Sequence, residues 1–151
     1  MQLAKPTLAD IGEMQRLIRV FIDEGTILSR SDEEVANAIR SYTIAKIDDA
    51  IVGFASLYIY TPSLAEVRSL AVGRNSQGHG VGSAIVEALI NEARSLKLKQ
   101  LLTLTYRATF FSRLGFHELP KEEVWHHKVW EDCIRCKHFP VCNEIALTLE
   151  L

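Results

Sequence analysis

The stretch that decides the fold runs from Ser69 to Leu96 and reads SLAVGRNSQGHGVGSAIVEALINEARSL. An apolar run ends at Val72, and a segment of polar and small residues with three glycines follows from Gly73 to Gly80. The apolar run predicts a strand, and the amphipathic pattern after it predicts a helix from about Gly80 to Leu96. A strand, a glycine-rich turn and a helix in this order are typical of loops that bind phosphate.

A loop of this kind would hold phosphate through its backbone. Successive N–H groups point inward, the helix dipole adds partial positive charge, and glycine lets oxygen atoms approach closely. A Walker loop is excluded because Ser83 and an alanine follow the last glycine, Gly82, where Lys and Ser or Thr are needed. The dinucleotide fingerprint is excluded because the glycines fall at Gly78, Gly80 and Gly82. The alternative interpretation is a tight strand-to-helix turn without a ligand.

The segments around this loop predict a mixed α/β sheet covered by helices. The predicted strands are 2–5, 42–48, 50–60, 65–72, 99–106 and 144–151, and the predicted helices are 7–25, 31–42, 80–96 and 108–115. Capping boxes at Thr7 and Ser31 mark the starts of the first two helices. A further strand near the C-terminus is left open. We expect a single domain over 1–151, with a cysteine-containing segment at about 125–143.

The composition narrows the class of protein. A chain of 151 residues, 48% of them hydrophobic, can bury its own core. The net charge of −2 and the absence of a basic stripe in the sequence argue against a nucleic-acid partner. No apolar run is long enough to span a bilayer, and the first residues lack the pattern of a signal peptide. We therefore expect a cytoplasmic protein that is not bound to a membrane, and the sequence leaves a homodimer open.

The loop carries the pattern Q-x-x-G-x-G at Gln77, Gly80 and Gly82, which resembles the GNAT superfamily of N-acetyltransferases. The resemblance extends over roughly 65–116: EVRSLAV stands where the family has its fourth strand, and FFSRLGF where it has a helix ending in Gly-Phe. It implies the GNAT fold, an N-acetyltransferase activity and acetyl-CoA as the acetyl donor. The implied donor-binding residues are Leu70, Ala71, Val72, Gln77, Gly78, His79, Gly80, Val81, Gly82 and Ser83, with His79 acting through its backbone.

Transfer of an acetyl group to an amine needs a base, donors for the oxyanion and help for the leaving thiolate. Glu66 is the candidate base, acting through a water molecule, and the alternative is a surface carboxylate. The oxyanion donors would be the backbone N–H groups of Leu70 or Val72. Many family members carry a tyrosine acid where this chain has Phe111. Tyr106 is the candidate replacement, although it is equally suited to packing.

A narrower resemblance concerns the acceptor. N-acetylglutamate synthases resemble this chain in the segment GTILSRSDEEV (25–35) and in the strands and helix already quoted. The tail WEDCIRC resembles that of the short, stand-alone bacterial members of the group. This implies acetylation of the α-amine of an amino acid, glutamate above all, which is the first step of arginine biosynthesis. Arg30, Arg68 and Arg107 are candidates to bind its carboxylates, because arginine holds carboxylates with two parallel hydrogen bonds. Each could instead be a solvated surface residue, and Arg68 could simply neutralise Glu66.

The three cysteines, Cys133, Cys136 and Cys142, lie close together with histidines nearby. Thiolates and imidazoles at short spacing are zinc ligands by type, although the second CxxC pair of a two-knuckle site is missing. A structural zinc site, buried thiols and a redox pair at Cys133 and Cys136 all remain open.

Two other functions compete with amino-acid acetylation. One keeps the enzyme and changes the acceptor to another small amine or a protein N-terminus. The other is a regulatory module that binds acyl-CoA without turnover, an interpretation that Phe111 keeps open.

Overall fold

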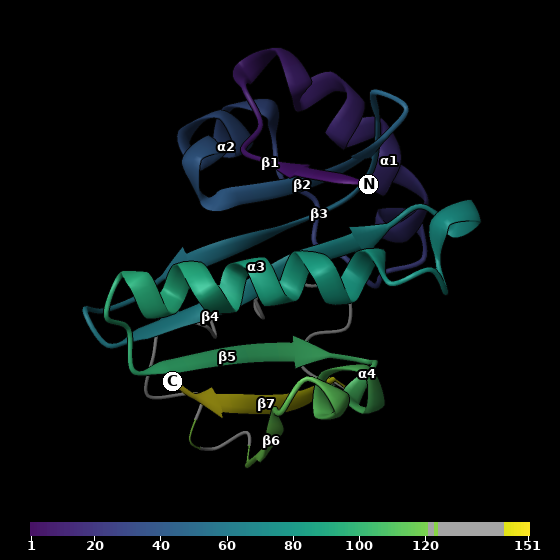
Figure 1. The fold of residues 1–151 in the computed structure, drawn as a ribbon. Helices are drawn as coiled ribbons and strands as arrows, with labels where there is room; N and C mark the ends of the chain where they lie inside the picture. The colour runs from purple at the N-terminus through teal and green to yellow at the C-terminus, as the bar shows by residue number, and fades with distance from the viewer. Residues whose placement is uncertain (121–122, 124–143) are drawn as a thin grey trace.

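A computed structural model describes residues 1–120, 123 and 144–151, and these form one sheet with helices on both faces (Figure 1). The strands are β1 (Gln2–Ala4), β2 (Tyr42–Ile47), β3 (Ala50–Ile59), β4 (Leu64–Val72), β5 (Gln100–Thr105), β6 (His117–Leu119) and β7 (Ile145–Glu150). The helices are α1 (Ile11–Asp23), α2 (Asp32–Asn37), α3 (Val81–Ser95) and α4 (Ala108–Arg113), with short 3-10 turns at η1 (Leu8–Asp10), η2 (Ile39–Ser41) and η3 (Arg74–Ser76).

The strand order across the sheet is β1-β2-β3-β4-β5-β7-β6. The pair β4 and β5 is parallel, and the other neighbours are antiparallel. The expected mixed sheet and the expected order of strands and helices are confirmed, and β6 is the further strand that the sequence left open.

Local signals in the sequence account for several boundaries. Thr7 and Ser31 each accept a hydrogen bond from the backbone of the turn that they begin, as the capping boxes predict. The sequence assigns Tyr42 both to the end of the second helix and to the start of a strand. The strand is confirmed, because Tyr42 opens β2, and the helical assignment is wrong, because α2 ends at Asn37. Tyr42 is buried and packs edge-to-face on Phe54 of the next strand, so tertiary contact decides its place.

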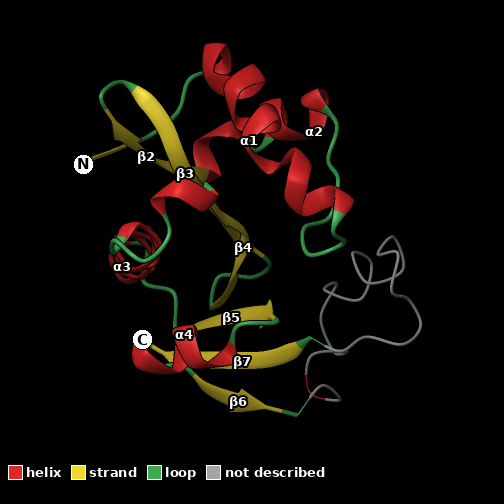
Figure 2. Cartoon of the chain, turned by 90° about the vertical axis from the view of Figure 1, so that its right-hand side faces the viewer, coloured by secondary structure: helices red, strands yellow, loops and turns green. Residues whose placement is uncertain are grey.

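Helices lie on both faces of the sheet (Figure 2), and the two larger hydrophobic cores of the described residues lie beneath them. Helix α3 and α4 cover one face, where Ile85 and Leu89 of α3 are fully buried. Helices α1 and α2 cover β2, β3 and the end of β4 on the other face, where Met14 is almost fully buried. The helices therefore leave the second half of that other face, over β4 and β5, without a helix of their own among the described residues.

Strand β4 changes its partners along its length. Its pairing with β5 covers Leu64 to Glu66 alone, and beyond that point the two strands part. Its pairing with β3 shifts register between Arg68 and Ala71, where Ser69 has a positive φ of 57°. This bulge reverses which side chains face which core, because Val67 and Leu70 both pack toward α3. The strand therefore opens a gap beside β5 in the same region in which it bulges.

Gly53 of β3 lies where the bulged strand and α3 approach most closely. A Cβ atom there would come within 2.9 Å of the carbonyl oxygen of Ala71 and 3.1 Å of Ile85. We expect Gly53→Ala to lower the free energy of unfolding by about 1–3 kcal/mol, measured by urea denaturation. Gly12→Ala is the matched control: it lies on the exposed side of α1 with open contacts and should stabilise by about 0.5–1 kcal/mol. Equal effects of the two changes would contradict this account of the packing.

Candidate functional site

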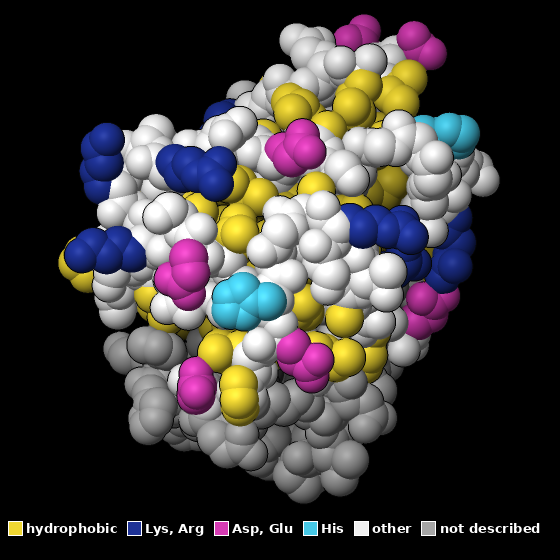
Figure 3. All heavy atoms as spheres, turned by 60° about the horizontal axis from the view of Figure 1, so that its bottom comes forward, with side chains coloured by type: hydrophobic (Ala, Val, Ile, Leu, Met, Phe, Trp, Pro, Cys, Tyr) yellow, Lys and Arg dark blue, Asp and Glu magenta, His cyan; other side chains and the backbone are white. Residues whose placement is uncertain are grey.

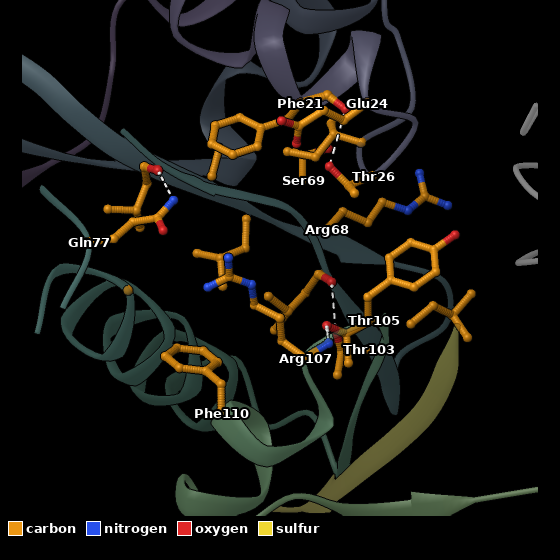
Figure 4. A pocket seen from close by; sticks show the side chains of 18 of the residues that line it. Phe21, Glu24, Thr26, Arg68, Ser69, Gln77, Thr103, Thr105, Arg107 and Phe110 are labelled. Atoms are coloured by element: carbon orange, nitrogen blue, oxygen red, sulfur yellow. Dashed lines mark hydrogen bonds between the residues drawn. The ribbon is translucent and has the colours of Figure 1, made fainter. Parts of the chain in front are cut away.

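A cavity of about 680 Å³ occupies the gap between the parted strands β4 and β5. Its walls come from the end of α1 and the segment after it, from β4, from the glycine loop and the start of α3, and from the end of β5 with α4 (Figure 4). The sequence-predicted residues Glu66, Leu70, Gln77 and Gly80 all line this one cavity, as do the candidate arginines and Tyr106.

The glycine loop is held against β4 by its glutamine. The side-chain amide of Gln77 donates to the carbonyl oxygen of Val72 at 2.9 Å. Gly78 and Gly80 have positive φ angles of 80° and 82°, which glycine adopts without the strain that other residues suffer. Gly80 is the N-cap of α3, so the N–H groups of Val81, Gly82 and Ser83 have no carbonyl of their own helix to bind. These donors and the helix dipole provide a place for an anion.

The loop residues differ in what they present to the cavity. Gly78, Gly80, Gly82 and Ser83 line it, and Val81 lines it while packing into the core. A Cβ atom at Gly82 would lie 3.3 Å from the ring of Phe110, so glycine allows α3 and α4 to meet closely. His79 is exposed and does not line the cavity.

The far half of β4 presents backbone to the same gap. The N–H of Gly73 donates to Val52 of β3 at 2.8 Å, and Ala71 pairs with Phe54 of β3. Because backbone groups alternate along a strand, those of Leu70 and Val72 face away from β3 and toward the parted β5. The acceptor role of the Val72 carbonyl toward Gln77 agrees with this direction.

Glu66 and Arg68 form a buried ion pair at the closed end of the gap. Arg68 Nε lies 2.8 Å from Glu66 Oε1, and the two side chains are 10% and 8% exposed. The hydroxyl of Tyr60 donates to the same Oε1 at 2.5 Å and accepts from Arg68 Nη2 at 2.7 Å. The ring of Tyr58 stacks on the Arg68 guanidinium at 3.6 Å. Sequence analysis missed Tyr60, whose place follows from the register of β3 against β4.

Burial raises the pKa of Tyr60, and the negative charge of Glu66 beside it raises that pKa further. The positive charge of Arg68 acts in the opposite direction but is the weaker influence. Tyr60 therefore stays protonated well above the range in which a solvated tyrosine ionises.

The other two candidate arginines lie on different walls. Arg30 lies between α1 and α2, directly before Ser31, which caps α2. The carbonyl oxygen of Arg30 accepts a hydrogen bond from the side chain of Gln15 at 2.9 Å. Arg107 is the N-cap of α4, and its guanidinium forms no hydrogen bond or ion pair with the residues that the structure describes. In Figure 4 the guanidinium of Arg107 extends toward the side on which Gln77 lies, whereas that of Arg68 extends away from it.

Tyr106 and Phe111 differ in environment. Tyr106 lines the cavity and is 40% exposed, so the expectation of a core tyrosine does not fit its place. Phe111 also lines the cavity but is 3% exposed, and its ring packs edge-to-face on Phe110 and Phe116. It has no group that could give a proton.

The comparisons with known proteins agree with this geometry. Residues 12–118 match the acetyltransferase (GNAT) family. The chain belongs to the GNAT family of acetyltransferases. It is therefore an N-acetyltransferase with the GNAT fold, as its sequence predicted.

Relatives of this N-acetyltransferase differ in length. An uncharacterized N-acetyltransferase of Chlorobaculum tepidum is 33% identical over 95% of this chain and 92% of its own. An amino-acid acetyltransferase of Mycobacterium tuberculosis is 30% identical over 74% of this chain and 65% of its own. The amino-acid acetyltransferase of Aeromonas salmonicida is 30% identical over 82% of this chain, which spans 28% of that longer protein.

Solved structures show the same arrangement. Rv2747 from Mycobacterium tuberculosis, in complex with CoA, has a TM-score of 0.84 and 25% identity over 100% of this chain and 99% of its own. N-acetylglutamate synthase from Neisseria gonorrhoeae, complexed with coenzyme A and N-acetyl-glutamate, has a TM-score of 0.87 and 25% identity. That match covers 99% of this chain and 35% of the synthase chain.

A second residue that sequence analysis missed is Arg74 of η3, which lines the cavity beside the glycine loop. Its guanidinium forms an ion pair with Glu24 at the end of α1 and lies 5.5 Å from the centre of the Phe21 ring. The two partners are 50 positions apart in the chain, so only the packing of α1 beside the end of β4 brings them together.

The cysteine predictions are not tested here, because Cys133, Cys136 and Cys142 lie outside the described residues. Within 1–120, 123 and 144–151, no group of three or more His, Cys, Asp and Glu side chains could hold a metal ion.

Over the same ranges no helix is both long and apolar enough to cross a membrane. On the face shown in Figure 3, Lys and Arg lie toward the edges with acidic and apolar side chains between them.

The raised pKa of Tyr60 gives a prediction that needs no substrate. In an alkaline titration of tyrosinate absorbance, Tyr60→Phe should remove amplitude only beyond the ordinary tyrosine range. Glu66→Gln should move that late step to lower pH, because it removes a negative charge that opposes ionisation. A late step that is unchanged by Glu66→Gln would contradict the hydrogen-bonded contact between the two side chains.

Proposed function

We propose that this N-acetyltransferase transfers the acetyl group of acetyl-CoA to the α-amine of an amino acid, and that L-glutamate is the acceptor. One observation carries the proposal: a single cavity joins an anion-binding helix start at one end to a buried carboxylate, Glu66, at the other. The named amino-acid acetyltransferases among the relatives support this acceptor class. The Neisseria synthase that resembles the chain was solved with N-acetyl-glutamate. This acceptor would place the enzyme at the start of arginine biosynthesis.

The donor would lie along β4 and end at the glycine loop. The pyrophosphate would bind the free N–H groups at the start of α3, between Gln77 and Ser83, with Gln77 holding the loop in place. The pantetheine chain would take the place of the missing strand beside Leu70 to Val72, whose backbone groups lack a partner on β5. Arg74 at the loop is suited to a further phosphate contact if it exchanges Glu24 for the donor.

The reaction would begin when the α-ammonium group loses a proton through a water molecule to Glu66. The nitrogen lone pair then attacks the thioester carbon, and the carbonyl oxygen becomes an oxyanion. The backbone N–H of Leu70 or Val72 would stabilise this charge, because such donors are fixed before the reaction. The attacking nitrogen, positively charged after the attack, gives up its second proton to water. The oxyanion collapses, the C–S bond breaks, and CoA leaves as a thiolate that takes up a proton.

The source of that last proton is a separate part of the proposal. Phe111 gives none, and Tyr106 places a phenolic hydroxyl on the cavity wall. A thiol pKa near ~8.5 makes the thiolate a fair leaving group even without an acid. We therefore assign Tyr106 a supporting role, smaller than that of Glu66.

The carboxylates of the acceptor would be bound by arginine. Arg68 already pairs with Glu66, which favours the neutralising role over substrate binding for this residue. Arg30 and Arg107 enter the same cavity from different walls and remain the proposed carboxylate ligands. Two arginines suit a dicarboxylic amino acid better than an amine without carboxylates.

The acceptor is tested by measuring thiol release from acetyl-CoA with each common amino acid separately. We expect thiol release with glutamate, and at most weaker release with glutamine, because the arginines bind a second carboxylate more strongly than an amide. Signal with protein N-termini or simple amines alone would contradict the amino-acid acceptor. Binding of acetyl-CoA without turnover on any amine would favour a regulatory module.

Glu66→Gln tests the base. The change keeps the size of the side chain and its ability to accept hydrogen bonds but removes the proton acceptor. We expect kcat to fall roughly a hundred-fold or more, while the affinity for acetyl-CoA measured by calorimetry stays within about two-fold. The exposed Glu87→Gln on α3 is the matched control and should leave both quantities unchanged. A Glu66→Gln variant with full kcat would remove Glu66 from the mechanism.

A further inference from the structure

Glu66 and Arg68 on the cavity wall form a ring of hydrogen bonds with Tyr60 behind them. Tyr60 donates to Glu66 Oε1 at 2.5 Å, Arg68 Nε donates to the same oxygen at 2.8 Å, and Arg68 Nη2 donates to the Tyr60 hydroxyl at 2.7 Å. Since Arg68 occupies a lone pair of that hydroxyl, the hydroxyl proton is directed at Glu66. The sheet holds the ring in place, because Glu66 pairs with Tyr58 and Arg68 with Ser56 across β3 and β4.

Burial alone would work against Glu66 as a base. Removing a carboxylate from water favours its neutral, protonated form, which cannot accept a proton from the substrate. Two donors on one oxygen, one of them a cation, favour the charged form instead. Tyr60 and Arg68 therefore both act on the charge state of Glu66.

We propose that Tyr60 is a positioning residue of the acetyl transfer: its hydroxyl holds Glu66 as an oriented carboxylate and fixes Arg68 beside it. This inference rests on the proposed role of Glu66 as the base. Tyr60 itself does not line the cavity, so it acts through Glu66 rather than on the substrate.

Tyr60 cannot be a proton relay in this arrangement. Burial and the Glu66 charge raise its pKa, so the phenol keeps its proton throughout the pH range in which the enzyme would work. A group that only donates can orient the carboxylate and stabilise its charge.

The chain offers a matched pair of variants. Tyr60→Phe removes the hydroxyl and keeps the ring. Tyr58→Phe removes a hydroxyl that makes no hydrogen bond to another described residue, and it keeps the ring against Arg68. Tyr58 is 39% exposed and lies outside the cavity, so its hydroxyl is a control for the loss of a tyrosine oxygen two residues away.

The first experiment is the pH dependence of kcat/KM with glutamate. The acid limb of Tyr60→Phe should move up by about one pH unit, since a hydrogen bond to a charged group favours that charge by about this amount. The loss should be about ten-fold at the acid end and should shrink toward alkaline pH. Tyr58→Phe should follow the wild type. The titration of the substrate amine is common to all three proteins and does not contribute to the difference.

The other charged or titratable groups that line the cavity in the described part of the chain are the same in the wild type and in the two variants. They come from the segment around α1, from η3, from the end of β5 and from the start of β7: Asp23, Glu24, Arg30, Arg74, Tyr106, Arg107 and Glu144. A shift that appears only in Tyr60→Phe is therefore assigned to the contact with Glu66. A loss of activity that is equal at every pH would mean that Tyr60 is merely structural and would overturn the inference.

A second experiment decides the question without turnover. The carboxyl carbon of Glu66 is followed by NMR in protein labelled with ¹³C-glutamate, and its signal is assigned by its disappearance in Glu66→Gln. We expect the midpoint of this titration to be higher in Tyr60→Phe than in the wild type. Equal midpoints would overturn the inference, whatever the acceptor is. If the wild type acetylated no amino acid, the proposed function would be wrong. The NMR titration would still decide whether Tyr60 stabilises the charged form of Glu66.

Discussion

The backbone pairing between β4 and β5 stops after Glu66 and Leu102, and the whole site depends on this stop. The next carbonyl on β4, that of Val67, accepts instead from the buried hydroxyl of Thr103 at 3.3 Å. The Thr103 side chain thus replaces the missing backbone donor of β5, and the strands can part while the buried carbonyl of Val67 keeps a hydrogen bond. The gap holds the cavity, and the unpaired edge of β4 is left for a ligand that can bind backbone.

The bulge at Ser69 divides β4 into two halves with different tasks. Before it, alternate side chains such as Glu66 and Arg68 point to the face away from α3. After it, Leu70 packs toward α3 while the small Ala71 faces the α1 side. In a regular strand without the bulge, side chains would keep alternating between the two faces, and Leu70 would point to the face away from α3. Its side chain would then occupy space that the cavity needs. One strand therefore supplies ionised side chains at one end and bare backbone at the other, as transfer between a bound thioester and an amine requires.

The sequence predicted the order of elements and most of the cavity wall because these features are local. The spacing of apolar residues, the capping boxes and the Q-x-x-G-x-G loop each lie within a short segment, and Gln77 and Gly80 line the cavity as a result. Tyr60 and Arg74 were missed because their partners depend on the register of β3 and β4 and on the packing of α1. The sequence assigned Tyr42 to both a helix and a strand, and its tertiary contact with Phe54 decides for the strand.

Stability alone gives little reason to keep Glu66 and Arg68 where they are. Removing two charges from water is costly, and a buried ion pair is often no more stabilising than apolar residues of the same size. Leu64 and Leu102 are buried on the same face of the sheet beside Glu66, so apolar packing is available at this place. The added hydroxyl of Tyr60 satisfies the pair further but does not remove the cost of burial. A buried carboxylate that accepts from Tyr60 and Arg68 and lines the cavity therefore agrees with the proposed role of Glu66 as the base.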